Sequence, residues 1–162
     1  MPDRDTLPLA GLTVLEFSHA VMGPCAGMIL ADLGAEVIKV EPTPDGDSTR
    51  RLAGAGVGFF GMYSRNKKSL TIDLKAPESR PVLDALARRA DVLIENFATG
   101  TMDRLGLGYE RLSDLNPRLV YCALKGFLSG PYEDRRALDE IVQMMSGLAY
   151  MTGPPGDPRR DR

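Results

Sequence analysis

Short apolar runs alternate with amphipathic stretches along most of this chain. Residues 12–17 and 36–41 are runs of branched and aromatic residues that predict two buried strands. Between them, a turn at residues 18–23 leads into a helix that begins at Pro24 and ends at Gly34, which we expect to be a left-handed cap. Strand, helix and strand in this order predict a right-handed crossover between parallel strands.

The same alternation continues to the end of the chain. Residues 42–58 are rich in glycine, proline and small polar residues, and they predict a long loop of the kind that is often functional. The pattern then predicts strands at residues 69–74, 91–97 and 119–124, and helices at residues 77–89, 109–115 and 139–148. In the last helix, the apolar positions expected to face inward are Ile141, Val142, Met145 and Leu148.

Alternating strands and helices predict an α/β fold, Rossmann-like, with a mostly parallel sheet and helices on both of its faces. A chain of 162 residues can bury one hydrophobic core. We therefore expect a polar lead-in at residues 1–8, one α/β domain at residues 9–153, and a proline-rich, charged tail at residues 154–162.

Composition and charge disfavour a nucleic-acid-binding, a membrane-spanning or a secreted protein. There are 20 basic and 22 acidic side chains, and a net charge of −2 gives no electrostatic reason to expect nucleic acid or an anionic membrane as a partner. No apolar run is long enough to span a bilayer, and the first residues, MPDRD, do not form a signal peptide. Cys25 and Cys122 lack metal-ligand spacing and are expected to be reduced, buried thiols. We expect a cytoplasmic protein without a metal site.

The turn at residues 18–23 is the strongest candidate site. It joins a strand to the N-terminus of a helix, where open α/β sheets bind ligands and exposed N–H groups favour phosphate. His19, the single histidine, lies in this turn, and we expect it to make contacts rather than to transfer protons. Glu41 ends the second strand, where a dinucleotide-binding domain keeps its ribose-binding acid. The G-x-G-x-x-G fingerprint is absent, however, which disfavours a nicotinamide cofactor.

Two loops carry positive charge suited to the phosphates of a nucleotide ligand, from Arg50 and Arg51 in one and from Lys67 and Lys68, next to Asn66, in the other. Solvated surface charge is the alternative for each of them. Asp139 opens the last predicted helix, where a carboxylate is favoured by the helix dipole, so we assign it a structural role.

Four segments of the chain together carry a resemblance to a known family. The first is VLEFSHAVMGPCAGMILADLGAEVIKVE, from residue 14 to residue 41. The others are NKKSLTIDLK at residues 66–75, ADVLIENF at 90–97 and DRLGLGYERLSDLNPRLVYCALKGF at 103–127. Together they resemble the opening of the class III CoA-transferases, the family of the formyl-CoA and carnitine CoA-transferases and of α-methylacyl-CoA racemase. The resemblance spans roughly residues 9–153, far more than one short motif.

This resemblance implies coenzyme A or an acyl-CoA as substrate, a carboxylic acid as acceptor, and no permanently bound cofactor. Residues in the segments that match the family's CoA-contacting regions are implied as CoA-binding: His19, Ala20, Val21, Met22, Asp73, Leu74, Lys75, Asn96, Phe97 and Arg104. The family subunit is longer and two-domained, and it forms an interlocked homodimer. The fold is therefore expected to be incomplete, with this chain as the N-terminal part, and a complementing C-terminal chain is a second possible partner.

The family's nucleophile is an aspartate in a glycine-flanked segment. Asp157 and Asp161 lie among prolines and arginines without those glycines, so the catalytic aspartate is expected beyond Arg162 and no catalytic residue within this chain. In the racemase branch, a histidine precedes the aspartate that matches Asp139. Leu138 stands there and cannot exchange a proton. A racemase relative, or a non-catalytic CoA- or nucleotide-binding fragment, is the alternative to a CoA-transferase.

Overall fold

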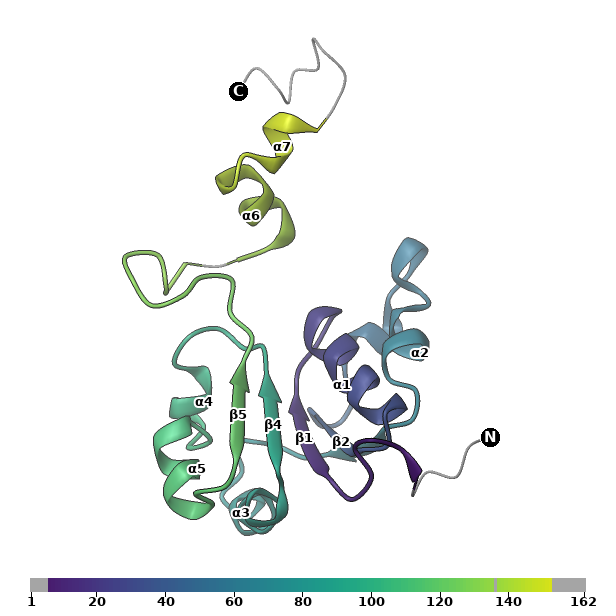
Figure 1. The fold of residues 1–162 in the computed structure, drawn as a ribbon, viewed down its shortest axis with the longest axis vertical. Helices are drawn as coiled ribbons and strands as arrows, with labels where there is room; N and C mark the ends of the chain where they lie inside the picture. Colours follow the sequence, from purple (N-terminus) through teal and green to yellow (C-terminus); the bar gives the residue numbers. More distant parts are fainter. Residues whose placement is uncertain (1–5, 136, 153–162) are drawn as a thin grey trace. The chain divides into compact units, whose positions relative to one another are not determined.

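The computed structural model describes residues 6–135 and 137–152, and the chain divides into two compact units, Met1–Leu124 and Lys125–Arg162. The first unit is built on a five-stranded parallel sheet (Figure 1). Its strands are β1 (Thr13–Phe17), β2 (Glu36–Glu41), β3 (Lys68–Thr71), β4 (Val92–Glu95) and β5 (Val120–Ala123). The strand order is β3-β2-β1-β4-β5, so the predicted α/β fold with a parallel sheet is confirmed.

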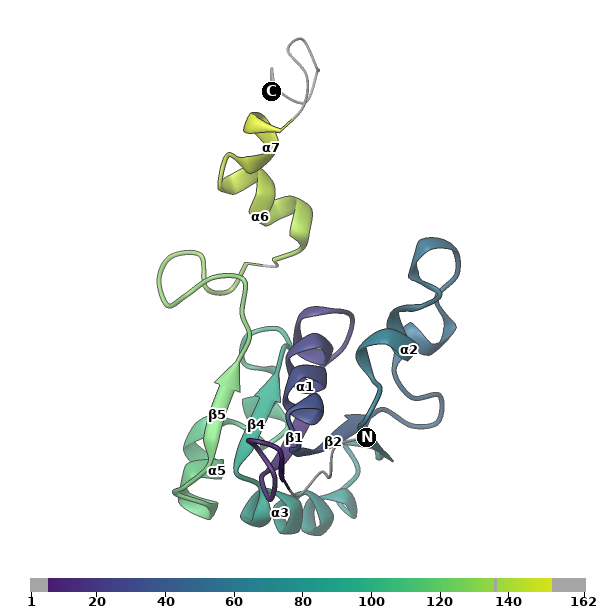
Figure 2. The same cartoon turned by 45° about the vertical axis from the view of Figure 1, so that its right-hand side comes forward.

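Helices cover both faces of the sheet because successive strand residues point to opposite sides. Leu15 packs in one cluster with residues of α3 (Ser79–Arg89), α4 (Thr101–Arg104) and α5 (Tyr109–Leu115). Its neighbour Val14 packs in a second cluster with Ala31 of α1 (Met22–Asp32). Helix α1 contacts β1, β2 and β4, as Figure 2 shows from the side on which this helix comes forward.

Predicted and observed elements agree best where the apolar pattern is regular. The strand at residues 36–41 and the helix at 109–115 have the predicted bounds. Gly34, with a φ of +107°, follows the end of α1 as expected. The loop at residues 42–58 contains two short 3-10 helices, η2 (Ser48–Arg51) and η3 (Gly54–Gly56), and α2 (Phe59–Tyr63) follows it.

The prediction for the second unit is wrong in two respects. A continuous helix over residues 139–148 was expected, but α6 (Asp139–Met145) ends before Gly147, whose φ is +78°, and α7 (Leu148–Met151) follows. The four side chains expected to face inward are at least 37% exposed, and neither helix buries a residue. Amphipathic spacing shows which face is apolar, but it does not supply the surface that would cover that face.

Other sequence-based expectations have mixed outcomes. Cys25 and Cys122 are both free thiols, but neither is buried as expected: Cys25 is partly buried, and Cys122, on the edge strand β5, is exposed. The predicted domain at residues 9–153 extends across both units and stays a prediction. Residues 1–5 of the lead-in and the whole 154–162 tail, with Asp157 and Asp161, lie outside the described residues. Within residues 6–135 and 137–152, every helix is too short or too polar to span a bilayer.

Candidate functional site

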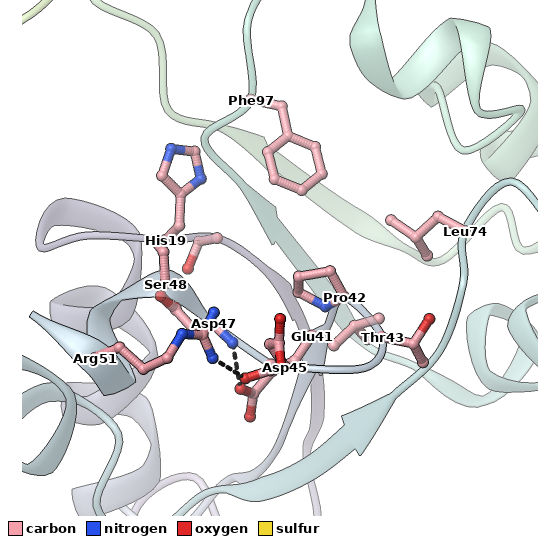
Figure 3. Close-up of a pocket in the computed structure, with 13 residues that line it drawn as sticks. His19, Glu41, Pro42, Thr43, Asp45, Asp47, Ser48, Arg51, Leu74 and Phe97 are labelled. Carbon is pink, nitrogen blue, oxygen red and sulfur yellow. Dashed lines mark hydrogen bonds between the residues drawn. The ribbon is translucent and has the colours of Figure 1, made fainter.

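A cavity of about 470 Å³ lies at the carboxyl ends of the central strands (Figure 3). Ser18 and His19 line it from the turn after β1, and Val40 and Glu41 from the end of β2. The loop after β2 contributes Pro42, Thr43, Asp45, Gly46, Asp47 and Ser48, and η2 contributes Arg51. Leu74 follows β3, and Phe97 follows β4. In open parallel sheets, this edge is where ligands bind.

The turn after β1 is fixed by side chains that directly follow β4, the neighbouring strand in the sheet. The Asn96 side chain accepts a hydrogen bond from the His19 N–H at 3.0 Å and donates one to the His19 carbonyl at 2.8 Å. The His19 ring stacks on Phe97, with ring centroids 5.8 Å apart. A Cβ on Gly23 would lie 2.3 Å from the Cβ of Ser18, so α1 can begin this close to the turn only with glycine there.

Four buried charges lie beneath this turn, and they are matched in sign. Lys39 Nζ is 3.1 Å from Glu16 Oε1 and 2.9 Å from Asp47 Oδ2. Lys67 Nζ is 2.5 Å from Glu16 Oε2 and donates to the carbonyl of Pro24 at 2.7 Å. All four side chains are at most 2% exposed, and pairing is what makes such burial tolerable. We call these four residues the buried charge cluster.

Environment shifts the ionisation of two members of this cluster. Burial raises the pKa of Asp47, but hydrogen bonds from Thr49 and Lys39 outweigh that effect and hold the pKa below its ordinary value. Burial lowers the pKa of Lys67, and the nearby Glu16 carboxylate offsets this only in part. Asp47 therefore stays charged down to acidic pH, as the ion pair with Lys39 requires.

Glu41 is also buried, and both of its carboxylate oxygens are occupied. Oε1 accepts hydrogen bonds from Arg50 Nη2 and Ser69 Oγ, each at 2.7 Å. Oε2 accepts from Arg50 Nε at 2.7 Å and from the Asp47 N–H at 2.8 Å. Burial opposes ionisation, yet these donors lower the pKa of Glu41 to about 2. With four donors already in place, Glu41 is poorly suited to hold a ribose, which agrees with the absence of the dinucleotide fingerprint.

The structure changes the interpretation of the basic loops. Arg50 pairs with Glu41, and Lys67 is buried against Glu16, so neither cation is offered to a ligand. Lys68 pairs with Glu36, which lies at the amino end of β2 and away from the cavity. Arg51 does line the cavity, and its guanidinium donates to the Asp45 carbonyl at 2.5 Å. Of these loop cations, Arg51 is thus the one at the cavity.

The residues carried over from the family resemblance come together in part. His19, Leu74 and Phe97 line the cavity, and Asn96 holds His19. Ala20, Val21 and Met22 are not among its lining residues, although Ala20 shapes the turn with a φ of +64°. Asp73, Lys75 and Arg104 also lie outside the lining: Asp73 accepts from the Lys75 N–H, and Arg104 donates to Thr101 within α4. Their binding of CoA stays a prediction.

The largest group of cavity residues that sequence analysis did not single out belongs to the loop after β2. Pro42, Thr43, Asp45 and Ser48 line the cavity, yet none was a candidate. The available signal was the position of this loop. It is long, rich in glycine and proline, and it follows a buried strand at the edge where ligands bind.

Comparison with known proteins places this architecture in a family. Residues 9–161 match the model of CoA-transferase family III. The chain belongs to this family. An acetyl-CoA:oxalate CoA-transferase from Acetobacter aceti is 44% identical to this family III chain over 98% of its length and 42% of the relative's. A succinate–glutarate CoA-transferase from Agrobacterium fabrum is 42% identical over 99% of the chain and 43% of its own length.

A solved structure agrees with the fold of the family III chain. The crystal structure of Rv3272, a hypothetical protein from Mycobacterium tuberculosis, superposes with a TM-score of 0.87 at 40% identity. The match covers 94% of this chain and 44% of that one. This chain spans about two fifths of the length of the curated relatives it matches. The predicted resemblance to the N-terminal portion of the family is confirmed.

Proposed function

We propose that this chain supplies the CoA-binding part of a CoA-transferase, which moves CoA from an acyl-CoA to a carboxylic acid. The observation that carries the proposal is the cavity at the carboxyl edge of the sheet. It gathers His19, Leu74 and Phe97 from three segments that resemble the CoA-contacting segments of the family. The relatives named above transfer CoA with oxalate, or with succinate and glutarate, according to their names.

The chemistry of the cavity suits a long, amphipathic and anionic ligand. The stacked rings of His19 and Phe97, together with Leu74, offer an apolar and aromatic surface for an adenine or a pantetheine arm. Arg51 at the cavity, and Lys75 next to Leu74, offer cations for the phosphates. Lys39 and Arg50 are already paired with carboxylates. The negative charge of the phosphates is therefore expected to be neutralised by Arg51 and Lys75.

The nucleophile is proposed to lie outside this chain. CoA transfer begins when an aspartate carboxylate attacks the thioester carbonyl, which forms a mixed anhydride and releases the CoA thiolate. The thiolate then attacks the enzyme's own carbonyl of that anhydride, giving an enzyme–CoA thioester and the free acid. Two of the three carboxylates that line the cavity, Glu41 and Asp47, are paired with Arg50 and Lys39, which disfavours both as nucleophiles.

Calorimetric titration with CoA tests the binding half of this proposal. Phe97→Ala and Leu74→Ala remove apolar surface from the cavity, so each is expected to weaken CoA binding about ten-fold. Val82→Ala is the matched control, because Val82 is an exposed residue of α3 outside the cavity, and it should bind CoA like the unaltered chain. If the unaltered chain showed no heat of CoA binding, the proposed function of this cavity would be wrong.

A comparison of CoA with dephospho-CoA tests the outer cations. The 3′-phosphate adds negative charge, so CoA should bind more tightly, and Arg51→Gln should reduce the difference between the two ligands. Equal affinities in the unaltered chain would argue against any contact between Arg51 or Lys75 and that phosphate.

Incubation with an acyl-CoA and a labelled carboxylic acid tests the catalytic half. This chain alone should form no new thioester, whereas a protein that also contains the remaining part of the family's sequence should form it. New thioester from this chain alone would show that the nucleophile lies within it. Loss of an α-proton label without transfer would favour the racemase alternative, and CoA binding with neither reaction would favour a non-catalytic module.

A further inference from the structure

Lys39 contacts both segments that border the cavity on the β1–β2 side. It lies within β2, beside Glu16 in the register of β1, and it is 1% exposed. Its ammonium donates to the Ser18 carbonyl at 2.7 Å and pairs with Asp47 Oδ2 at 2.9 Å. Ser18 belongs to the turn after β1, and Asp47 to the loop after β2. One buried charge therefore connects two backbone segments that line the same cavity.

On the turn, the peptide unit between Ser18 and His19 is held from both sides. Lys39 donates to its carbonyl oxygen, and the side chain of Asn96 accepts from its N–H at 3.0 Å. This peptide precedes Ala20, whose positive φ of +64° turns the chain toward α1. A backbone fixed at both its donor and its acceptor keeps His19 in a single orientation, with its ring against Phe97.

On the loop, Asp47 is hydrogen-bonded to the neighbouring residues as well as paired with Lys39. Its Oδ1 accepts from the Thr49 N–H at 2.8 Å and from Thr49 Oγ1 at 2.7 Å, which caps η2. Its own N–H donates to Glu41 Oε2 at 2.8 Å. Besides the bond of Lys39 to Glu16 within the core, two bonds of this pair end on the backbone of segments that border the cavity: Lys39 to the Ser18 carbonyl, and the Thr49 N–H to Asp47.

We propose that Lys39 is a positioning residue that sets the separation between the Ser18–His19 turn and the 42–48 loop, and so the width of the cavity for CoA. The CoA part of this inference rests on the proposed function, whereas the positional part rests on the geometry alone. Lys39 is not among the residues that line the cavity. It acts through Ser18 and Asp47.

The test uses a variant that removes the connection and keeps the buried charges balanced. Lys39→Met alone would leave Glu16 and Asp47 with Lys67 as their one cation, and the chain could fail to fold. The double variant Lys39→Met/Asp47→Asn leaves Glu16 paired with Lys67 and removes one charge of each sign. Asn116→Ala is the control for lost stability, because Asn116 donates to the Ala87 and Ala90 carbonyls, remote from the cavity.

Two measurements distinguish positioning from general destabilisation. Amide hydrogen exchange reports on the His19 N–H, bonded to Asn96, and on the Gly46 N–H, which donates to the Pro42 carbonyl at 2.8 Å. In the double variant, both amides should exchange at least about ten times faster, with β4 amides little changed. CoA titration should show about ten-fold weaker binding in the double variant and unchanged binding in Asn116→Ala.

The outcomes separate this inference from the proposed function. Faster exchange at His19 and Gly46 in the double variant, and not in Asn116→Ala, supports the positioning role even if CoA fails to bind the unaltered chain. Failure of that binding would count against the proposed function alone. Unchanged exchange at both amides in the double variant overturns the positioning role, and equal loss of CoA affinity in the double variant and in Asn116→Ala overturns its effect on the width of the cavity for CoA.

Discussion

The buried carboxylate of Glu41, at the end of β2, stays ionised because hydrogen-bond donors surround it. Glu41 is 1% exposed and would be neutral in an apolar site, but Arg50, Ser69 and the Asp47 N–H stabilise its charged form. The lowering of its pKa from 4.5 to about 2 favours the folded state by about 3 kcal/mol at neutral pH. Because the folded-state pKa is depressed, this stability is complete above pH 4.5 and is lost as the pH falls toward 2.

Glu41→Gln should therefore change the acid sensitivity of the protein. We expect the variant to be less stable than the unaltered chain at pH 7, and the difference in unfolding free energy to shrink by about 3 kcal/mol between pH 4.5 and pH 2. Urea unfolding at a series of pH values measures it. Glu110→Gln, at an exposed position of α5, is the control and should show a nearly constant difference. A pH-independent difference for Glu41→Gln would contradict the assignment.

At the scale of elements, α1 meets β1 through a glycine because a charged group occupies the space a side chain would need. A Cβ on Gly27 would lie 1.9 Å from Glu16 Oε2 and 3.1 Å from Lys67 Nζ. Neither atom can move freely, because the two groups are paired with each other beneath the helix. The buried charge cluster thus dictates how closely this helix approaches the sheet.

Two glycine substitutions should consequently have opposite effects. Gly27→Ala is expected to destabilise the protein by about 1–3 kcal/mol, since the added methyl group displaces the Glu16 carboxylate. Gly61→Ala in α2 is expected to stabilise it by about 0.5–1 kcal/mol, because nothing lies within 4 Å of the new Cβ and alanine favours helix. Thermal or urea unfolding of both variants measures this. Equal effects of the two changes would disprove the close-approach argument.

At the scale of the whole molecule, the two units differ in what they bury. Both hydrophobic clusters lie in Met1–Leu124, whereas α6 and α7 of the second unit bury no residue. Apolar burial is the main source of folding free energy, so the stability of the chain should reside in the first unit. The exposed apolar residues of the second unit, which include Leu138, Met144 and Met151, contribute little to it.

Shortening the chain tests this division. A chain that ends at Leu124 should still unfold cooperatively, with nearly the same free energy of unfolding as residues 1–162. A chain that ends at Pro117 loses β5 and the buried Leu119, and it should be less stable by at least about 2 kcal/mol. Circular dichroism during urea unfolding compares the two. Loss of cooperative unfolding in the longer fragment would show that the first unit depends on the second.

Much of the fold could be predicted from the sequence by itself, because hydrophobic periodicity is a local property. The strand at residues 36–41 and the helix at 109–115 have the predicted bounds, and the alternation of strands and helices indicated the parallel sheet. The resemblance to CoA-transferase family III could also be recognised from the sequence alone, in segments such as ADVLIENF, and the match to the family model confirms it. Each of these conclusions follows from the identity of residues that are close together in the sequence, and none requires knowledge of contacts between distant segments.

Only the tertiary structure decided the roles of the charged residues. Arg50 and Lys67 had the composition and position of phosphate-binding residues, yet each is paired with a carboxylate, Glu41 or Glu16. Lys67 and Glu16 are 51 positions apart in the sequence, and they meet because the pairing of β1 with β2 and of β2 with β3 brings the residue before β3 close to β1. An ionisable group's state depends on burial and on the nearest opposite charge, and both are set by contacts between distant segments.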